Sequence, residues 1–144
     1  MKRLLFLFSF IAANAGAADF RSVQESAAVL YDAPSRAATP LFVVQRNYPL
    51  EVIVSDAAGW IKVRDAAGAL TWIERKALSD KRTVLVTAPV AEVRAKPEEG
   101  GATLFSVAQN VVLELVEPGP GGWLRVRYAD GTVGFIRATA VWGG

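Results

Sequence analysis

A stretch of ten residues occurs twice in this 144-residue chain. It reads GWIKVRDAAG at Gly59–Gly68 and GWLRVRYADG at Gly122–Gly131, an offset of 63 positions. Aligned at that offset, Pro34–Glu74 and Pro97–Arg137 share 14 identical residues over 41 pairs without a gap. The duplication predicts two copies of one module of roughly 60 residues, a size that closes only a small hydrophobic core.

Short strands are predicted throughout both copies. Trp60–Arg64 and Trp123–Arg127 alternate apolar and charged residues with the period of a strand that buries one face. Asp130 and Gly131 form a hairpin signal after the second of these segments. With the β-branched segments that precede them, about five short strands are expected in each copy, and Arg75–Leu78 is expected to form a short 3₁₀ turn. The pattern favours small, strongly bent β-barrels.

The first 17 residues are typical of a secretory signal peptide. Two basic residues, Lys2 and Arg3, precede an apolar run over residues 4–13, and cleavage after Ala15 or after Ala17 fits the pattern. The run is too short to span a bilayer, which takes about 20 apolar residues. We therefore expect a periplasmic or secreted protein with no stable membrane anchor after cleavage. Because the chain has no cysteine, it is not expected to be a lipoprotein.

The charge and composition exclude several classes of function. Without Lys2 and Arg3, 14 of the 16 basic residues remain against 14 acidic residues, and they are not clustered, so no nucleic-acid partner is expected. The absence of histidine and cysteine removes the common nucleophilic sites and zinc ligand sets. Glu98 and Glu99 are read as solvated loop charges and not as a catalytic carboxylate pair. We expect no enzyme, no metal and no cofactor.

The second copy carries the motifs of a known family. VRAKP at 93–97 is followed by GWLRVR at 122–127, the turn at Asp130 and Gly131, and GFI at 134–136. This order and spacing resemble the bacterial SH3 domain family (SH3b, SH3-like). The resemblance implies an all-β chain of two tandem SH3-like small β-barrels.

The first copy departs from the family pattern. Its LYDAP at 30–34 lacks the Val-Arg pair, and Thr71 stands where the family has glycine. The expected division is a signal peptide over 1–17, a first domain over 18–80 and a second over 81–144. The sequence leaves open whether both modules bind a ligand.

The repeated tryptophans are the main candidates for ligand binding. Trp60 shares the outer face of its strand with Lys62 and Arg64, and a half-exposed indole beside a guanidinium suits a glycan or a peptide carboxylate. The alternative is structural, with each tryptophan packed over a neighbouring loop or the other module, and Trp142 closing the second barrel. The candidate ligand-binding residues are Tyr31, Trp60, Arg64, Trp72, Trp123, Arg127, Tyr128 and Phe135.

The resemblance also implies a function. Members of the family are non-catalytic and bind peptidoglycan or envelope partners, so the predicted ligand is peptidoglycan or an envelope protein. Two weak sites on one chain gain effective concentration on a repeating polymer. The alternative is a protein–protein adaptor or a homodimeric scaffold that buries the aromatic faces at an interface. The sequence does not decide the oligomeric state.

Overall fold

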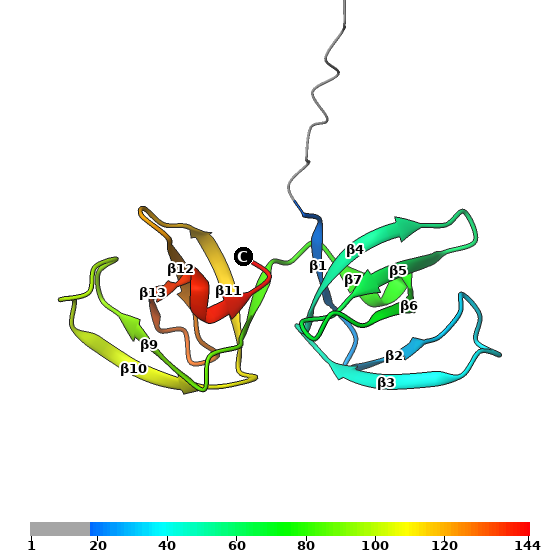
Figure 1. Ribbon diagram of the computed structural model, residues 1–144, viewed down its shortest axis with the longest axis horizontal. Coiled ribbons are helices and arrows are strands. Elements are labelled where there is room, and N and C mark those ends of the chain that lie inside the picture. The colour runs from blue at the N-terminus through cyan, green and yellow to red at the C-terminus, as the bar shows by residue number, and fades with distance from the viewer. Residues whose placement is uncertain (1–17) are drawn as a thin grey trace, which may run out of the picture.

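The computed structural model describes residues 18–144, which form two antiparallel sheets of seven strands each (Figure 1). The prediction of an all-β chain is confirmed. The first module consists of β1 (Phe20–Val23), β2 (Ala27–Tyr31), β3 (Pro40–Gln45), β4 (Pro49–Ser55), β5 (Trp60–Arg64), β6 (Leu70–Glu74), η1 (Arg75–Ala77) and β7 (Leu78–Ser79). The second module consists of β8 (Thr83–Val86), β9 (Val90–Arg94), β10 (Thr103–Ala108), β11 (Val112–Pro118), β12 (Trp123–Arg127), β13 (Val133–Arg137), η2 (Ala138–Ala140) and β14 (Val141–Trp142).

The predicted duplication extends to the strand order. The sheets run β3-β2-β6-β5-β4-β1-β7 and β10-β9-β13-β12-β11-β8-β14, which is the same order in both modules. Even the unusual backbone repeats, because Asn47 and Asn110 both have a φ of 71°. Asparagine tolerates this left-handed conformation better than most residues. The amide of Asn47 donates to the Val23 carbonyl, and that of Asn110 to the Val86 carbonyl, both at 2.8 Å.

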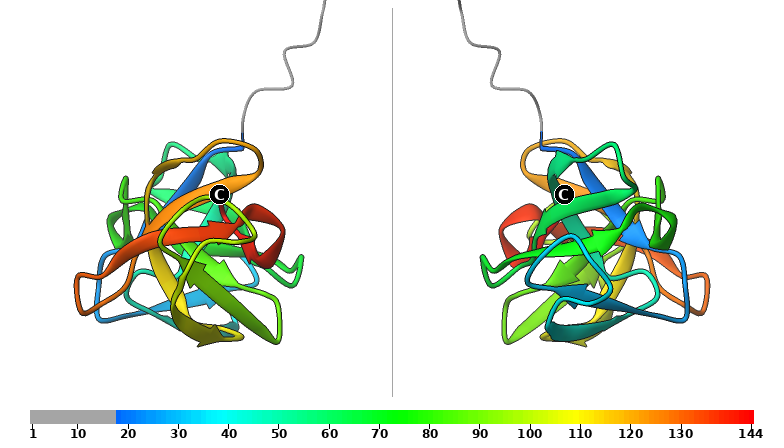
Figure 2. Two further views of the ribbon diagram at one scale, coloured as in Figure 1. Left: turned by 90° about the vertical axis from the view of Figure 1, so that its left-hand side faces the viewer. Right: turned by 90° about the vertical axis from the view of Figure 1, so that its right-hand side faces the viewer.

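Each sheet curls around its own apolar core. In β5, Ile61 and Val63 point inward and join the first core cluster, as the alternation of the strand predicts. A register shift interrupts the pairing of β4 with β5 between Val52 and Val54, and the same shift recurs 63 residues later in β11. Bulges of this kind bend a strand, and in Figure 2 the strands within a module cross at steep angles.

The two modules lie side by side and contact each other (Figure 1). The Thr83 hydroxyl donates to the carbonyl of Asn47 at 2.6 Å, and the Ser22 hydroxyl donates to the carbonyl of Lys81 at 2.7 Å. Trp142, which we predicted to close the second barrel, pairs its backbone with Leu85 in that sheet. Its ring, however, packs against Phe20 of the first module. Trp142 is therefore part of the junction between the modules.

Helical structure is limited to two short turns in the described part of the chain. Turn η1 confirms the 3₁₀ turn expected near Arg75–Leu78. Within residues 18–144, no helix is long and apolar enough to cross a membrane. The signal peptide predicted over residues 1–17 lies outside the described residues.

Candidate functional site

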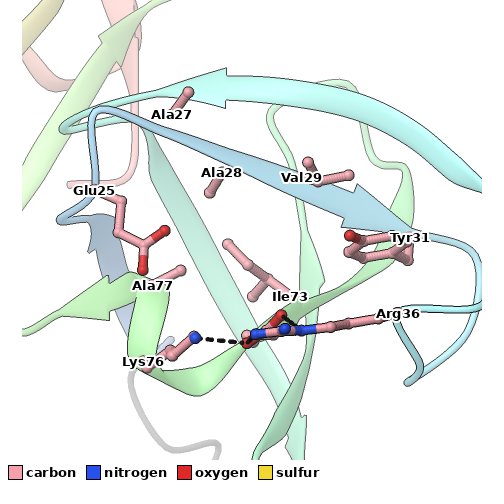
Figure 3. A pocket seen from close by; sticks show the side chains of 10 residues that line it. Glu25, Ala27, Ala28, Val29, Tyr31, Arg36, Ile73, Lys76 and Ala77 are labelled. Atoms are coloured by element: carbon pink, nitrogen blue, oxygen red, sulfur yellow. Dashed lines mark hydrogen bonds and ion pairs between the residues drawn. The ribbon is translucent and has the colours of Figure 1, made fainter.

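The same groove is present at the same place in both modules. In the first module it lies between β2 and the end of β6 with η1, and Figure 3 shows Tyr31 and Arg36 at one end and Glu25 and Lys76 at the other. All ten residues that line it have a counterpart 63 positions later that lines the second groove. The volumes are about 180 Å³ for the first groove and about 320 Å³ for the second. The second reaches the lower end of the range typical of ligand pockets.

A closed loop places Arg36 over the first groove. The loop spans residues 32–39 between β2 and β3, and Asp32 fixes its two ends. The Asp32 amide donates to the Thr39 carbonyl at 3.1 Å, and the Asp32 carboxylate accepts from the Thr39 amide at 3.0 Å. Arg36 in this loop therefore reaches back to Glu74, the last residue of β6.

The ion pair in the first groove is bidentate. The Arg36 Nε donates to one Glu74 oxygen at 2.6 Å, and Nη2 donates to the other at 3.0 Å. Lys76 Nζ lies 3.4 Å from the same carboxylate. The hydrogen bond from Arg36 is the main cause that lowers the pKa of Glu74 below its ordinary value, and Lys76 adds to the effect.

The second groove contains the same ion pair with the charges exchanged. Glu99 stands at the position of Arg36, Arg137 stands at the position of Glu74, and the two form a salt bridge. The cation is therefore on the loop in the first module and on the strand in the second. Arg94, at the position of Tyr31, pairs with Glu92 inside the same groove.

The repeated tryptophans stand beside the grooves, but they are not half-exposed as we predicted. Only 9% of Trp60 and 5% of Trp123 is accessible. Each lies on the outer face of its strand, where its cross-strand partner is Glu74 or Arg137 respectively. The prediction failed because other side chains cover the indoles, so the structural alternative of packing near a loop describes both residues.

Different groups cover the two indoles. In the first module the Tyr31 ring meets Trp60 edge to face, with centroids 5.6 Å apart. In the second module the Arg137 guanidinium lies 4.4 Å from the centre of the Trp123 ring, which is a cation–π contact. Trp123 itself lines the second groove, and Trp60 contacts Tyr31, which lines the first.

The other predicted site residues fall into two groups. By register, Trp72 lies beside Tyr31 and Phe135 lies beside Arg94, so both adjoin the grooves. The remaining three are elsewhere: Arg64 pairs with Glu51 at 3.2 Å, Arg127 pairs with Glu114 at 3.3 Å, and Tyr128 packs against Phe105.

Sequence reasoning missed the charged residues of the grooves. None of Glu25, Arg36, Glu74 and Lys76 was a candidate, because no motif or identical pair of the repeat includes them. A signal was present, since Arg36 becomes Glu99 and Glu74 becomes Arg137 at the 63-residue offset. Two positions that exchange opposite charges together are expected to be in contact.

The grooves offer charge and aromatic surface for binding. Within residues 18–144, no group of three or more Asp or Glu side chains is arranged to hold a metal ion. What the grooves supply is a carboxylate or a guanidinium next to an aromatic ring, which is chemistry suited to recognising the charged group of a small ligand.

Comparison with known proteins identifies the fold. A model of the bacterial SH3 domain matches residues 24–80 and again residues 88–143. The chain belongs to the bacterial SH3 domain family. The two modules are thus tandem bacterial SH3 domains, which confirms the family suggested by the VRAKP and GWLRVR motifs. No curated protein matches the chain.

Several solved structures are similar to this pair of bacterial SH3 domains. NlpC2 and NlpC1 from Trichomonas vaginalis have 14% and 15% identity, and the match covers 88% and 96% of this chain, both with a TM-score of 0.40. An NlpC/P60 family protein from Bacillus cereus has 20% identity over 85% of this chain, with a TM-score of 0.38. The matched regions span 48%, 50% and 55% of those three proteins, so this chain corresponds to about half of their length.

Proposed function

We propose that this chain is a non-catalytic protein of the bacterial periplasm that binds peptidoglycan through the grooves beside Trp60 and Trp123. The observation that carries the proposal is the recurrence of one groove at equivalent positions in both SH3 modules, each with an ion pair across it. Family membership supports the cell-wall ligand, and the sequence of residues 1–17 supports export.

The chemistry of peptidoglycan fits the grooves. Its peptide stems carry free carboxylates and amino groups, and its glycan strands repeat many times. The loop partners of the two ion pairs, Arg36 and Glu99, are well exposed, so a charged group of a ligand can exchange for either of them. Two such sites on one chain raise the effective concentration on a repeating polymer.

An adaptor role is the second candidate, and one observation favours it. Strand β3 is at the edge of the first sheet, and Leu41, Phe42 and Val43 on it are exposed. An exposed apolar edge strand can pair with a strand of another protein. Size-exclusion chromatography with light scattering separates the alternatives, because a homodimer through β3 doubles the mass in the absence of cell-wall fragments.

Tryptophan fluorescence tests the peptidoglycan proposal directly. The purified protein is titrated with soluble muropeptides, together with the variants Glu74→Gln and Arg137→Gln. We expect a saturable change in the wild type that is weakened in either variant. Arg64→Gln is the matched control, because Arg64 forms an equivalent ion pair away from the groove and should not alter binding. If the wild type shows no change, and isolated sacculi do not retain the protein, the peptidoglycan proposal is wrong.

A further inference from the structure

We infer that the two grooves bind groups of opposite charge: the first binds an ammonium or guanidinium group, and the second binds a carboxylate. This assignment of ligands rests on the function proposed above and makes it more specific. It comes from the exchange of charge between equivalent positions, Arg36 and Glu74 in one module against Glu99 and Arg137 in the other.

The two partners of each ion pair differ in how firmly they are held. The loop side chains are the more exposed ones, at 68% for Arg36 and 73% for Glu99. The strand partners are less exposed, at 22% for Glu74 and 42% for Arg137. Because a strand residue is fixed by its backbone pairing, the loop residue is the one that a ligand displaces. The strand residue then meets the ligand.

The strand residues are further held by contacts within their own modules. Arg137 lies against the Trp123 ring at 4.4 Å, so it keeps its position when Glu99 leaves. Glu74 keeps Lys76 as a neighbour at 3.4 Å when Arg36 leaves. A cation entering the first groove therefore shares the Glu74 carboxylate with Lys76, whereas a carboxylate entering the second groove takes the place of Glu99 on Arg137.

The formal charge that remains in each groove after its loop residue is displaced agrees with this assignment. Without Arg36, the first groove is lined by Glu25, Glu74 and Lys76, which sum to one negative charge. Without Glu99, the charged residues of the second groove carry one positive charge, because Glu92 and Arg94 cancel and Arg137 remains.

The ligand class follows from this pair of charges. A peptide with a free amino group and a free carboxyl group supplies one group for each groove. In a polymer with many such peptides, the two groups can come from neighbouring stems. A ligand with only one kind of charge would occupy only one module.

Two alanine dipeptides of opposite charge test the assignment on the wild-type protein. N-Acetylalanylalanine carries one carboxylate and no cation, whereas alanylalanine amide carries one ammonium and no carboxylate. Each is titrated into the ¹⁵N-labelled protein, and the indole signals of Trp60 and Trp123, assigned with Trp→Phe variants, are followed by NMR. We expect the carboxylate probe to shift the Trp123 signal and the ammonium probe to shift the Trp60 signal.

Exchanging the ion pair within a module is the sharper test. The double variant Arg36→Glu, Glu74→Arg gives the ion pair of the first module the orientation found in the second, so the pair is retained and folding is expected to be preserved. In this variant the Trp60 signal should respond to the carboxylate probe, and its response to the ammonium probe should weaken about tenfold, as for the loss of one charge-assisted hydrogen bond. Exchange of Arg64 and Glu51, an ion pair outside the groove, is the control and should change neither response.

The outcomes separate this inference from the proposed function. Muropeptide binding at both tryptophans without any preference between the dipeptides overturns the charge assignment and leaves the proposed function standing. A preference that persists unchanged in the exchanged variant also overturns it. If neither muropeptides nor dipeptides shift either indole signal, the proposed function fails and the charge assignment fails with it.

Discussion

The rings of Phe20 and Trp142 meet edge to face across the junction, with centroids 5.0 Å apart and planes at 88°. Phe20 begins the first strand of the first module, and Trp142 ends the last strand of the second. The Arg82 guanidinium lies 5.5 Å from the centre of the same Phe20 ring. Because these contacts join the two ends of the folded chain, each module is expected to depend on the other for part of its stability.

A double-mutant cycle measures that dependence. We expect Phe20→Ala and Trp142→Ala to lower the free energy of unfolding non-additively, with a coupling of about 0.5–1.5 kcal/mol, the value typical of aromatic pairs. Urea unfolding of the two single variants and the double variant gives the coupling. Pairing Trp142→Ala with Phe105→Ala is the control, since Phe105 packs against Tyr128 and not at the junction. Additive effects of Phe20 and Trp142 would show that the modules are energetically independent.

The pKa of Glu74 is expected to depend on Arg36. The hydrogen bond from Arg36 lowers this pKa, so replacing Arg36 with glutamine should raise it toward the ordinary glutamate value of about 4.3. The measurement is an NMR titration of the Glu74 side-chain carboxyl carbon in the wild type and in Arg36→Gln. An unchanged pKa would mean that the loop of residues 32–39 does not hold Arg36 over the groove in solution.

The same pair makes stability depend on pH in a defined direction. A carboxylate whose pKa is lowered on folding stabilises the folded state above its unfolded pKa, and the stabilisation is lost as the pH falls through the folded pKa. We therefore expect the free energy of unfolding to decrease below about pH 4.3. Glu74→Gln should lack this part of the decrease when thermal unfolding is compared at several pH values. Equal pH dependence in both proteins would contradict the prediction.

Gly134 is predicted to tolerate no side chain. A Cβ at this position would lie 2.6 Å from Val93 Cγ1 and 2.9 Å from the Arg94 carbonyl oxygen. Gly134→Ala should lower the free energy of unfolding by about 1–3 kcal/mol through overpacking. Gly100→Ala is the matched control, because its Cβ would meet nothing within 4 Å, and chemical denaturation of both variants gives the comparison. Equal stability of the two variants would be inconsistent with this packing.

Asp65 is predicted to stabilise the hairpin between β5 and β6. Its buried carboxylate accepts hydrogen bonds from the amides of Ala67 at 3.0 Å and Ala69 at 2.9 Å. Asp65→Ala should cost about 1–2 kcal/mol in thermal or urea unfolding, because two amides lose their acceptor. Asp130→Ala should cost less. Asp130 is exposed, and its carboxylate accepts a hydrogen bond from the amide of one other residue, Thr132.

The pKa of Tyr48 provides a second test of the position of Asp65. Burial, and then the negative charge of Asp65, raises the pKa of Tyr48. Asp65→Asn should therefore lower this pKa, which ultraviolet titration of the phenol measures. A pKa that stays unchanged would indicate that burial alone accounts for the shift.

The fold was predictable because the alternation and turn patterns that indicate its strands are local in the sequence and occur twice. The alternation in Trp60–Arg64 places Ile61 and Val63 in the core, and the turn at Asp130 and Gly131 predicts the hairpin between β12 and β13. About five strands were expected in each module and the structure has seven, because two-residue strands such as β7 and β14 are too short to show an alternation. The repeat at an offset of 63 residues then predicts that the second module has the same strands. None of these inferences requires knowledge of contacts between distant parts of the chain.

The site was harder to predict because its contacts come from segments far apart in sequence. Alternation places Trp60 on the outer face of its strand, but it contains no information about what lies above that face. The coverage of Trp60 depends on Tyr31, and that of Trp123 depends on Arg137. The groove likewise joins a loop after β2 to the end of β6, and only the paired charge exchange hints at this in the sequence.

The hydrogen bonds from Ser22 to Lys81 and from Thr83 to Asn47 attach the short link between the sheets and the start of β8 to the first module. The separation between the two grooves is then set by the protein and not by the ligand. Under the proposed function, such a chain distinguishes polymers by spacing as well as by composition. A polymer whose charged groups recur at the matching interval occupies both modules at once, whereas the same groups at another interval engage only one.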